Sequence, residues 1–323
     1  MKTRIGNNIN EAIELLKNSE LVAIPTETVY GLAANGLDEK AISKIFKAKK
    51  RPLSNPLILH FKDLDSLSNF VTELPLPAEK LAKQFWPGPL TLLLDKADHI
   101  PAIVNSGKKK IAVRIPDHPI IKKLLERIDF PIAAPSANLY GRISPTQAIH
   151  VSNQLDGVIA YILDGGPCSK GLESTIVGFD DGNTIIYRLG AITTEEIEAC
   201  IDHKALVHDH KSLEDGPIAS GMVKYHYAPQ TPLYNINDIP KASLNKNYGY
   251  IGYHEIINGV PAENQFLLSK EKDLGIASSN LYHALHYMDK KGFDGIFICQ
   301  FPSKGLGKSM NDRIQKAIAK FKK

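Results

Sequence analysis

Cysteine is scarce in this chain of 323 residues, which contains only Cys168, Cys200 and Cys299. Because the three lie far apart, form no C-x-x-C pair and leave one unmatched, they do not predict a disulfide framework. The first ten residues lack the apolar core of a signal peptide, and no apolar run approaches the length that spans a bilayer. These absences favour a cytoplasmic protein with no membrane contact.

The common signatures of nucleotide and metal sites are incomplete. Residues 305–309 resemble the end of a phosphate-binding loop, but Pro302 stands where its first glycine belongs. His283 and His286 can share a helix face, yet no cysteines or carboxylates stand near them at ligand spacing. No Ser-His-Asp order, nucleophile elbow or carboxylate pair predicts covalent or glycoside chemistry. We therefore expect no metal site built by the protein alone and no organic cofactor.

The composition is that of a globular protein with two domains. With 43% hydrophobic residues the chain can bury a core in each, and its formal net charge of +4 permits contact with nucleotides or RNA. From residue 203 to 232 the apolar periodicity disappears, which is typical of a linker. We predict a first domain over 1–203, a linker over 204–232 and a small domain over 233–323. Alternating strand and helix patterns in the last part predict a small parallel α/β domain.

One stretch, residues 21–60, organises the first domain. It reads as a buried strand (21–24), a polar elbow (25–28), a helix (40–47), a basic cluster (47–51) and a second strand (57–61). Hydroxyl, amide and guanidinium groups recur at the ends of this and later strands. Because open α/β sheets bind ligands beside strand ends, these groups predict a site for an anion.

Several of these groups have plainer explanations. The basic cluster alone is typical of a solvated helix end, where cations complement the helix dipole. Ser136 alone can be a helix cap and Asn138 a turn residue. Arg114 is more informative, because an arginine inside an apolar strand is costly unless an anionic partner neutralises it.

Taken together, the motifs resemble the YrdC-like family. The resemblance rests on Pro-Thr-Glu-Thr-Val-Tyr-Gly-Leu at 25–32, Lys-x-Arg-Pro at 49–52, Asn-Pro-Leu at 55–57, Trp-Pro-Gly-Pro-Leu-Thr at 86–91, Val-Arg-Ile-Pro at 113–116, Ser-x-Asn at 136–138 and Glu-Ser-Thr-Ile-Val at 173–177. Residues 221–229 and 294–313 resemble the linker and C-terminal domain of the long members, the threonylcarbamoyl-AMP synthases. The chain has Ser220 where proline is common before Gly-Met, and Leu189 where proline is common between arginine and glycine.

This resemblance implies a fold and an activity. The fold is a twisted mixed α/β sheet with a concave basic surface, followed by a smaller Rossmann-like α/β domain. The activity joins L-threonine, bicarbonate or carbon dioxide, and ATP with Mg²⁺ into threonylcarbamoyl-AMP, releasing pyrophosphate, for threonylcarbamoyladenosine modification of tRNA. The partners implied are these substrates, downstream threonylcarbamoyl transferase proteins and, by contact, tRNA.

The resemblance also implies site residues. The family's catalytic Lys-x-Arg and Ser-x-Asn set falls on Lys49, Arg51, Ser136 and Asn138. Threonine-binding positions fall on Thr28, His60, Arg114, Ala134 and Ser174. ATP-binding positions fall on Arg51, Asn55, Lys110, Ser136, Ser144 and Arg188, with His226 or Tyr227 closing from the linker. Mg²⁺ is expected to be held mainly by ATP.

Two alternatives stay open from the residues themselves. One is a non-catalytic module that binds double-stranded RNA or tRNA through its phosphates. The other is an enzyme that adenylates or carbamoylates another small amine, which differs only in the details of the pocket. Salt-dependent RNA binding without ATP turnover distinguishes the first, and a screen of amino acids distinguishes the second.

Overall fold

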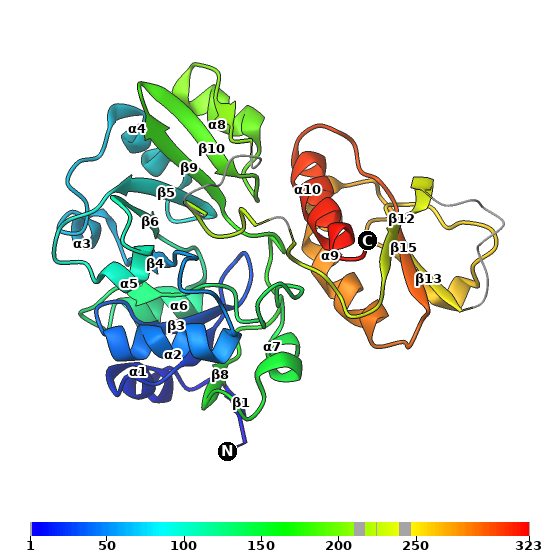
Figure 1. Ribbon diagram of the computed structural model, residues 1–323, viewed down its shortest axis with the longest axis horizontal. Coiled ribbons are helices and arrows are strands. Elements are labelled where there is room, and N and C mark those ends of the chain that lie inside the picture. The colour runs from blue at the N-terminus through cyan, green and yellow to red at the C-terminus, as the bar shows by residue number, and fades with distance from the viewer. Residues whose placement is uncertain (1, 210–216, 224, 239–246, 323) are drawn as a thin grey trace.

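A computed structural model of the chain describes residues 2–209, 217–223, 225–238 and 247–322. Within these residues the chain forms a large α/β unit, at the left of Figure 1, and a smaller one at the right. The prediction of an α/β protein built on a large mixed sheet is confirmed. No described helix is both long and apolar enough to cross a bilayer.

The large unit is built on an 11-stranded mixed sheet. Its strands in spatial order are β1 (Arg4–Gly6), β8 (Tyr161–Leu163), β2 (Val22–Ile24), β3 (Gly31–Asn35), β7 (Ile132–Ala133), β4 (Ile58–His60), β6 (Lys110–Arg114), β5 (Leu90–Asp95), β9 (Thr175–Asp180), β10 (Asn183–Arg188) and β11 (Leu206–Val207). Because β4 and β6 are parallel and in register, His60 lies beside Arg114 where both strands end.

Alternation along the strands sends side chains to two faces, and different elements cover them. The helices of this unit are α1 (Ile9–Lys17), α2 (Glu39–Lys49), α3 (Leu64–Leu67), α4 (Leu76–Phe85), α5 (Ala102–Asn105), α6 (Pro119–Leu125), α7 (Ala148–Leu155) and α8 (Thr194–Ile201). In β2, Ala23 joins the core packed by α2, α4 and α8, whereas Val22 and Ile24 join the core packed by α1 and α6. Farther along this second face, Ala219 and Met222 of the linker take the place of a helix.

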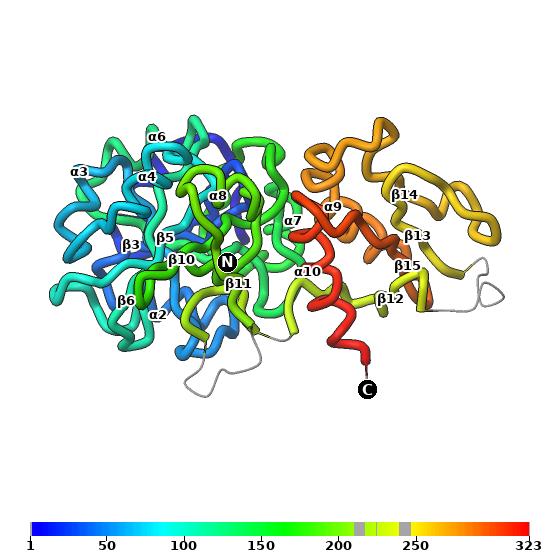
Figure 2. Tube along the Cα trace, turned by 90° about the horizontal axis from the view of Figure 1, so that it is seen from above, coloured from blue at the N-terminus to red at the C-terminus, as the bar shows by residue number. Residues whose placement is uncertain are grey.

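The smaller unit is built on a four-stranded sheet with all neighbours parallel. Its elements are β12 (Leu233–Asn235), β15 (Gly295–Ile298), β13 (Tyr248–Gly252), β14 (Gln265–Leu267), the 3₁₀ turns η1 (Ile236–Asp238) and η3 (Ala262–Asn264), and the helices α9 (Leu274–Asp289) and α10 (Leu306–Ala319). In Figures 1 and 2, α9 and α10 lie between this sheet and the large unit. Val29, Ile143 and Leu172 of the large unit contribute to its core.

A side-chain cap sets where α9 begins. The Asp273 side chain accepts a hydrogen bond from the Ile276 backbone, and the helix starts at Leu274. Helix α7 was not predicted from the sequence. Its first turn has no side-chain cap and the helix is only eight residues long, so its sequence signal is weak.

Candidate active site

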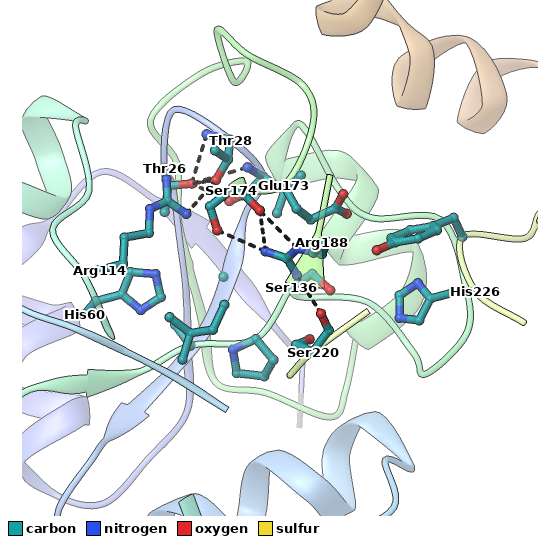
Figure 3. Close-up of a pocket in the computed structure, with 16 residues that line it drawn as sticks. Thr26, Thr28, His60, Arg114, Ser136, Glu173, Ser174, Arg188, Ser220 and His226 are labelled. Carbon is teal, nitrogen blue, oxygen red and sulfur yellow. Dashed lines mark hydrogen bonds between the residues drawn. The ribbon is translucent and has the colours of Figure 1, made fainter. Parts of the chain in front are cut away.

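A pocket lies where several strands of the large sheet end, on the face that the linker covers. Figure 3 shows His60 and Arg114 at one end of it, His226 at the other, and Ser174 and Arg188 between them. The lining side chains come from the elbow after β2, from the ends of β4, β6 and β10, from the segments after β7 and before β9, and from the linker. Polar groups from the ends of these strands therefore line one pocket.

Arg114 has the anionic partner that its buried position requires. Its Nη2 lies 2.7 Å from Oε1 of Glu27, and both side chains are only 5% exposed. Its Nη1 donates to Oγ1 of Thr28 at 3.0 Å, and its Nε donates to the Gly88 carbonyl at 3.2 Å. The elbow is held by Thr26, whose hydroxyl donates to the Val29 carbonyl and accepts the Thr28 backbone N–H. The guanidinium is therefore fixed in direction, as a carboxylate-binding group must be.

His60 stands next to Arg114 as a neutral imidazole. Burial, together with the positive charge of Arg114, lowers the pKa of His60 to about 3. Its Nδ1 is buried and has no hydrogen-bond partner among the described residues. A polar ligand beside Arg114 would therefore meet a neutral ring at physiological pH, which adds no second positive charge.

The Lys-x-Arg and Ser-x-Asn motifs are joined by a buried cation. Lys49 ends α2 with its side chain 1% exposed, and its ammonium donates to the backbone carbonyls of Ser136 and Asn138. Burial and the nearby Arg51 lower the pKa of Lys49 well below its usual value. Asn138 in turn donates its amide to the carbonyls of Leu139 and Arg142, so it holds a turn. Of this set, only Ser136 lines the pocket.

Arg51, which lies just after α2, connects the loop between α2 and β4 to the linker. Its guanidinium donates to the carbonyls of Asn55 and Pro56, at 3.2 and 3.0 Å, and to Oγ of Ser220 at 3.3 Å. Burial is the main reason that the pKa of Arg51 falls to about 10. The plainer explanation of the basic cluster, a solvated helix end, is thus correct for the exposed Lys47 and Lys50 and incorrect for Arg51.

Arg188 joins the sheet to the linker from the end of β10. Its Nε and Nη2 donate to the Ser174 carbonyl at 3.0 and 2.9 Å, and Nη2 also donates to Oγ of Ser174 at 2.9 Å. Its Nη1 donates to the Ser220 carbonyl at 3.2 Å. All these partners are neutral, so the guanidinium keeps its charge available for an anion in the pocket.

The linker lies over the pocket. Ala219 and Met222 pack against Ile58, Leu93 and Ala112 of the sheet face. Ser220, His226 and Tyr227 line the pocket, whose free volume is about 40 Å³. Burial lowers the pKa of His226 well below its usual value, so this ring too is neutral. A volume of this size admits water-sized molecules but no nucleotide.

Glu173 is a pocket residue that sequence reasoning missed. Its carboxylate accepts hydrogen bonds from Ser144 at 2.6 Å, from Tyr282 at 3.1 and 3.0 Å, and from Nε of Arg313 at 2.9 Å. Burial raises its pKa, but Arg313, Arg188 and these hydrogen bonds outweigh burial and lower the pKa to about 2. Its motif, Glu-Ser-Thr, was visible in the sequence. Its partners were not, because Tyr282 and Arg313 belong to the smaller unit.

The depressed pKa of Glu173 predicts an acid-sensitive contribution to stability. A carboxyl group whose pKa falls from 4.5 to about 2 on folding stabilises the protein fully above pH 4.5 and loses that contribution as the pH falls toward 2. We expect wild type to exceed Glu173→Gln in free energy of unfolding at neutral pH, and the difference to shrink by about 3 kcal/mol on acidification. Urea titrations of both proteins at a series of pH values measure it. A difference that does not change with pH would contradict this assignment.

The structure brings most of the predicted residues to the pocket, but not all. All five threonine-binding candidates line it: Thr28, His60, Arg114, Ala134 and Ser174. Among the nucleotide candidates, Ser136, Arg188, His226 and Tyr227 line it, and Arg51 reaches it through Ser220. Lys49, Asn138 and Asn55 stand behind the wall, where the Asn55 amide donates to Tyr140.

Two nucleotide candidates lie elsewhere. Lys110 stands at the opposite end of β6 from Arg114, 3.3 Å from Asp95 and hydrogen-bonded to the Phe179 carbonyl, beside a different cavity. Ser144 is fully buried and donates to Glu173. Among the described residues, no group of three or more His, Cys, Asp or Glu side chains is placed to hold a metal ion.

Comparison with known proteins agrees with this arrangement. Residues 14–190 match the Sua5/YciO/YrdC family model, described as "Telomere recombination", and residues 192–319 match "Threonylcarbamoyl-AMP synthase, C-terminal domain". A threonylcarbamoyl-AMP synthase of Bacillus subtilis is 39% identical over 96% of this chain and 92% of its own length. One of Pyrococcus abyssi is 38% identical over 96% of both chains.

A solved structure extends the likeness to three dimensions. The crystal structure of Pyrococcus abyssi Sua5 complexed with L-threonine superposes with a TM-score of 0.89 at 37% identity, covering 98% of both chains. Both units of the chain are therefore shared with that protein, including the elements that build the pocket. The chain belongs to the Sua5/YciO/YrdC family, in the two-domain form that carries the threonylcarbamoyl-AMP synthase C-terminal domain.

Proposed function

We propose that the chain is an L-threonylcarbamoyladenylate synthase, which makes threonylcarbamoyl-AMP and pyrophosphate from L-threonine, ATP and bicarbonate or carbon dioxide. The observation that carries the proposal is the pairing of two cationic groups within one pocket. Arg114, with Thr28 and His60, forms one end, and Arg188, with Ser136, lies between that end and His226 at the other. A pocket with two such cationic groups suits an amino acid joined to a nucleotide, and a relative has been solved in complex with L-threonine.

At the amino-acid end, Arg114 binds the threonine carboxylate. Its guanidinium is already oriented by Glu27 and Thr28, so little orientational freedom is lost when the substrate binds. Ser174 and the Ala134 backbone contact the rest of the amino acid. The neutral His60 adds no positive charge near the amine, which favours the uncharged amine that is needed for reaction.

At the nucleotide end, Arg188 and Arg51 bind the phosphates and Ser136 orients them, whereas Asn55, which stands behind the wall, stays a prediction. Mg²⁺ supplies charge neutralisation of the triphosphate when bound. Among the described residues, the two carboxylates nearest these groups, Glu27 and Glu173, are both paired, so ATP oxygens and water would hold the ion. Lys110 and Ser144 stay predictions as ATP contacts, since each needs a rearrangement to reach the pocket.

The reaction joins the two ends. The neutral threonine amine attacks carbon dioxide and loses a proton to give a carbamate. A carbamate oxygen then attacks the α-phosphorus of ATP in line, and the bond to pyrophosphate breaks. Arg51 and Arg188 stabilise the charge that develops on the phosphates, and no protein side chain becomes covalently attached.

The linker must move for ATP to enter, because the free volume of about 40 Å³ under Ser220, His226 and Tyr227 is too small for a nucleotide. We propose that the linker withdraws for entry and returns over the bound nucleotide. Through Ser220 it accepts hydrogen bonds from Arg51 and Arg188 on neutral oxygens, and the charged phosphates of ATP would replace these with stronger ones.

The finer features of the molecule belong to the same proposal. We propose a concave basic surface around the pocket, a Rossmann-like second domain, and domain limits of 1–203 and 233–323 on either side of the linker. The product passes to downstream threonylcarbamoyl transferase proteins, and the basic surface contacts tRNA. A cytoplasmic location is supported by three cysteines that remain as free thiols.

Mass spectrometry tests the function directly. Purified protein incubated with L-threonine, bicarbonate, ATP and Mg²⁺ is expected to form threonylcarbamoyl-AMP, and omission of threonine is expected to abolish it. A panel of other amino acids tests substrate choice in the same assay. Salt-dependent RNA binding with no threonine-dependent pyrophosphate release would overturn the proposal in favour of an RNA-binding module.

Replacement of Arg51 by lysine is expected to lower kcat/KM for ATP about tenfold or more. Lysine keeps the charge but lacks the planar fork that reaches two acceptors at once. Threonine-dependent pyrophosphate release, measured over a range of ATP concentrations, gives kcat and the KM for ATP. An Arg51→Lys enzyme with wild-type values would remove Arg51 from the phosphate site.

A further inference from the structure

The smaller unit contacts the pocket through one buried carboxylate. Glu173 lines the pocket, yet two of its hydrogen-bond donors, Tyr282 on α9 and Arg313 on α10, come from the smaller unit. Both donors are completely shielded from solvent, at 0% and 1% exposure. In Figure 3 the Glu173 carboxylate points away from Arg114, toward the side on which His226 lies. It therefore faces the smaller unit and leaves the substrate end of the pocket free.

Arg313 makes contact with three parts of the pocket wall at once. Its Nε donates to Glu173, its Nη2 donates to the Leu189 carbonyl at 2.6 Å, and its guanidinium carbon lies 4.8 Å from the centre of the Tyr227 ring. Asp312 lies beside Nη1, so every nitrogen of the guanidinium has a partner. One side chain of the smaller unit thereby ties the segment before β9, the end of β10 and the linker together.

Each of these contacts adjoins a group that faces the substrates. Glu173 precedes Ser174, whose carbonyl and hydroxyl accept hydrogen bonds from Arg188. Leu189 follows Arg188 directly. Tyr227, which has the left-handed φ of 63° that a non-glycine residue adopts at a cost, lies next to His226 in the pocket wall. A small displacement of Arg313 would therefore move the Ser174 and Arg188 pair and the linker together.

We propose that Tyr282 and Arg313 are positioning residues, through which the second domain sets the Ser174–Arg188 wall of the pocket by way of Glu173. Neither side chain lines the pocket, so both act through residues that do. The expected change in Michaelis constants rests on the proposed function. The expected loosening of the pocket wall rests on the contacts alone. It gives the second domain a part in substrate binding.

Tyr282→Phe is the sharpest test, because it removes one hydroxyl and keeps the ring that packs in the core. We expect the Michaelis constant for L-threonine to rise about tenfold, the size of effect of losing a hydrogen bond to a charged group, with a smaller change for ATP. Loss of folded protein would instead lower the apparent kcat and leave both Michaelis constants unchanged. Tyr250→Phe, which removes the hydroxyl of a buried tyrosine on β13 of the same unit, is the matched control and should keep wild-type constants.

A double-mutant cycle shows whether Tyr282 acts through Glu173. In a Glu173→Gln background, Tyr282→Phe should change the Michaelis constant for threonine by no more than about twofold, because its charged acceptor is already gone. If the two substitutions instead raised the Michaelis constant by independent factors that multiply in the double variant, Tyr282 would not act through Glu173. Arg313→Lys retains the charge opposite Glu173 but cannot reach Leu189 at the same time. Its Michaelis constant for threonine should lie between those of wild type and Tyr282→Phe.

Hydrogen exchange of the protein without substrates provides a readout that does not depend on the activity. In Tyr282→Phe the backbone amides of residues 172–178 and 225–228 should exchange faster than in wild type, while those of β13 should not. Unchanged exchange in both segments, or faster exchange with an unchanged Michaelis constant for threonine, overturns the proposal. If wild type itself makes no threonylcarbamoyl-AMP, the proposed function fails, and the exchange measurement still decides whether Tyr282 holds the pocket wall.

Discussion

Replacement of Arg114 by glutamine is expected to raise the Michaelis constant for L-threonine at least about a hundredfold, with little change in that for ATP. A carboxylate bound by an arginine accepts two charge-assisted hydrogen bonds, each worth about 1.5–3 kcal/mol, and glutamine cannot replace them. The position is also fixed by its surroundings, since Arg114 is held between Glu27 and Thr28. Pyrophosphate release at varied threonine concentrations, with calorimetric titration of threonine, measures the effect.

The same substitution leaves Glu27 buried without its partner, which costs about 3–5 kcal/mol of stability in comparable pairs. A Glu27→Gln, Arg114→Gln double variant separates the two effects, because it removes the unpaired charge and should recover most of the stability. Threonine binding should stay lost in the double variant. Recovery of binding along with stability would place the carboxylate site away from Arg114.

Lys49→Met is expected to lower kcat/KM by about a hundredfold or more, although Lys49 does not line the pocket. Its ammonium is the group that holds the carbonyls of Ser136 and Asn138, and methionine leaves both without a charged donor. Ser136 would then lose its fixed place at the nucleotide end. The free energy of unfolding should fall as well, by about 2–4 kcal/mol for two buried acceptors left unsatisfied.

Lys47→Met provides the matched control, because Lys47 lies on the same helix, two residues earlier, with its side chain exposed. It should keep wild-type activity and stability. If Lys49→Met behaved like Lys47→Met, the hydrogen bonds that join the two motifs would not be needed for catalysis. Pyrophosphate release and thermal unfolding of both variants decide the matter.

The part of the site that follows from the strand patterns and from the cost of burying a charge could be predicted from the sequence. Arg114 predicted a buried anionic partner, because a guanidinium inside an apolar strand is costly unless an anion neutralises it. Glu27 in the elbow is that partner. His60 and Arg114 could be expected together, since both end apolar strands and parallel strands end at one edge.

Other features depended on contacts that periodicity does not report. The basic cluster looked like a solvated helix end, and two of its lysines are exposed, whereas Lys49 is buried against carbonyls that lie 87 and 89 residues away. Glu173 was visible in its motif, but its role is set by Tyr282 and Arg313, more than a hundred residues farther on. Lys110 stays a prediction, because both ends of β6 carry a cation and the Arg114 end is the one that lines the pocket.

The shared core of the two units has a consequence for the order in which the chain is made. Val29, Ile143 and Leu172 belong to the first unit, yet they pack with Leu281, Tyr282 and Leu285 of the second. During synthesis the first unit leaves the ribosome before its partner exists, so these apolar side chains face water until α9 has followed. We therefore expect a chain ended in the linker to be more prone to aggregation than the full-length protein, even if its large sheet forms.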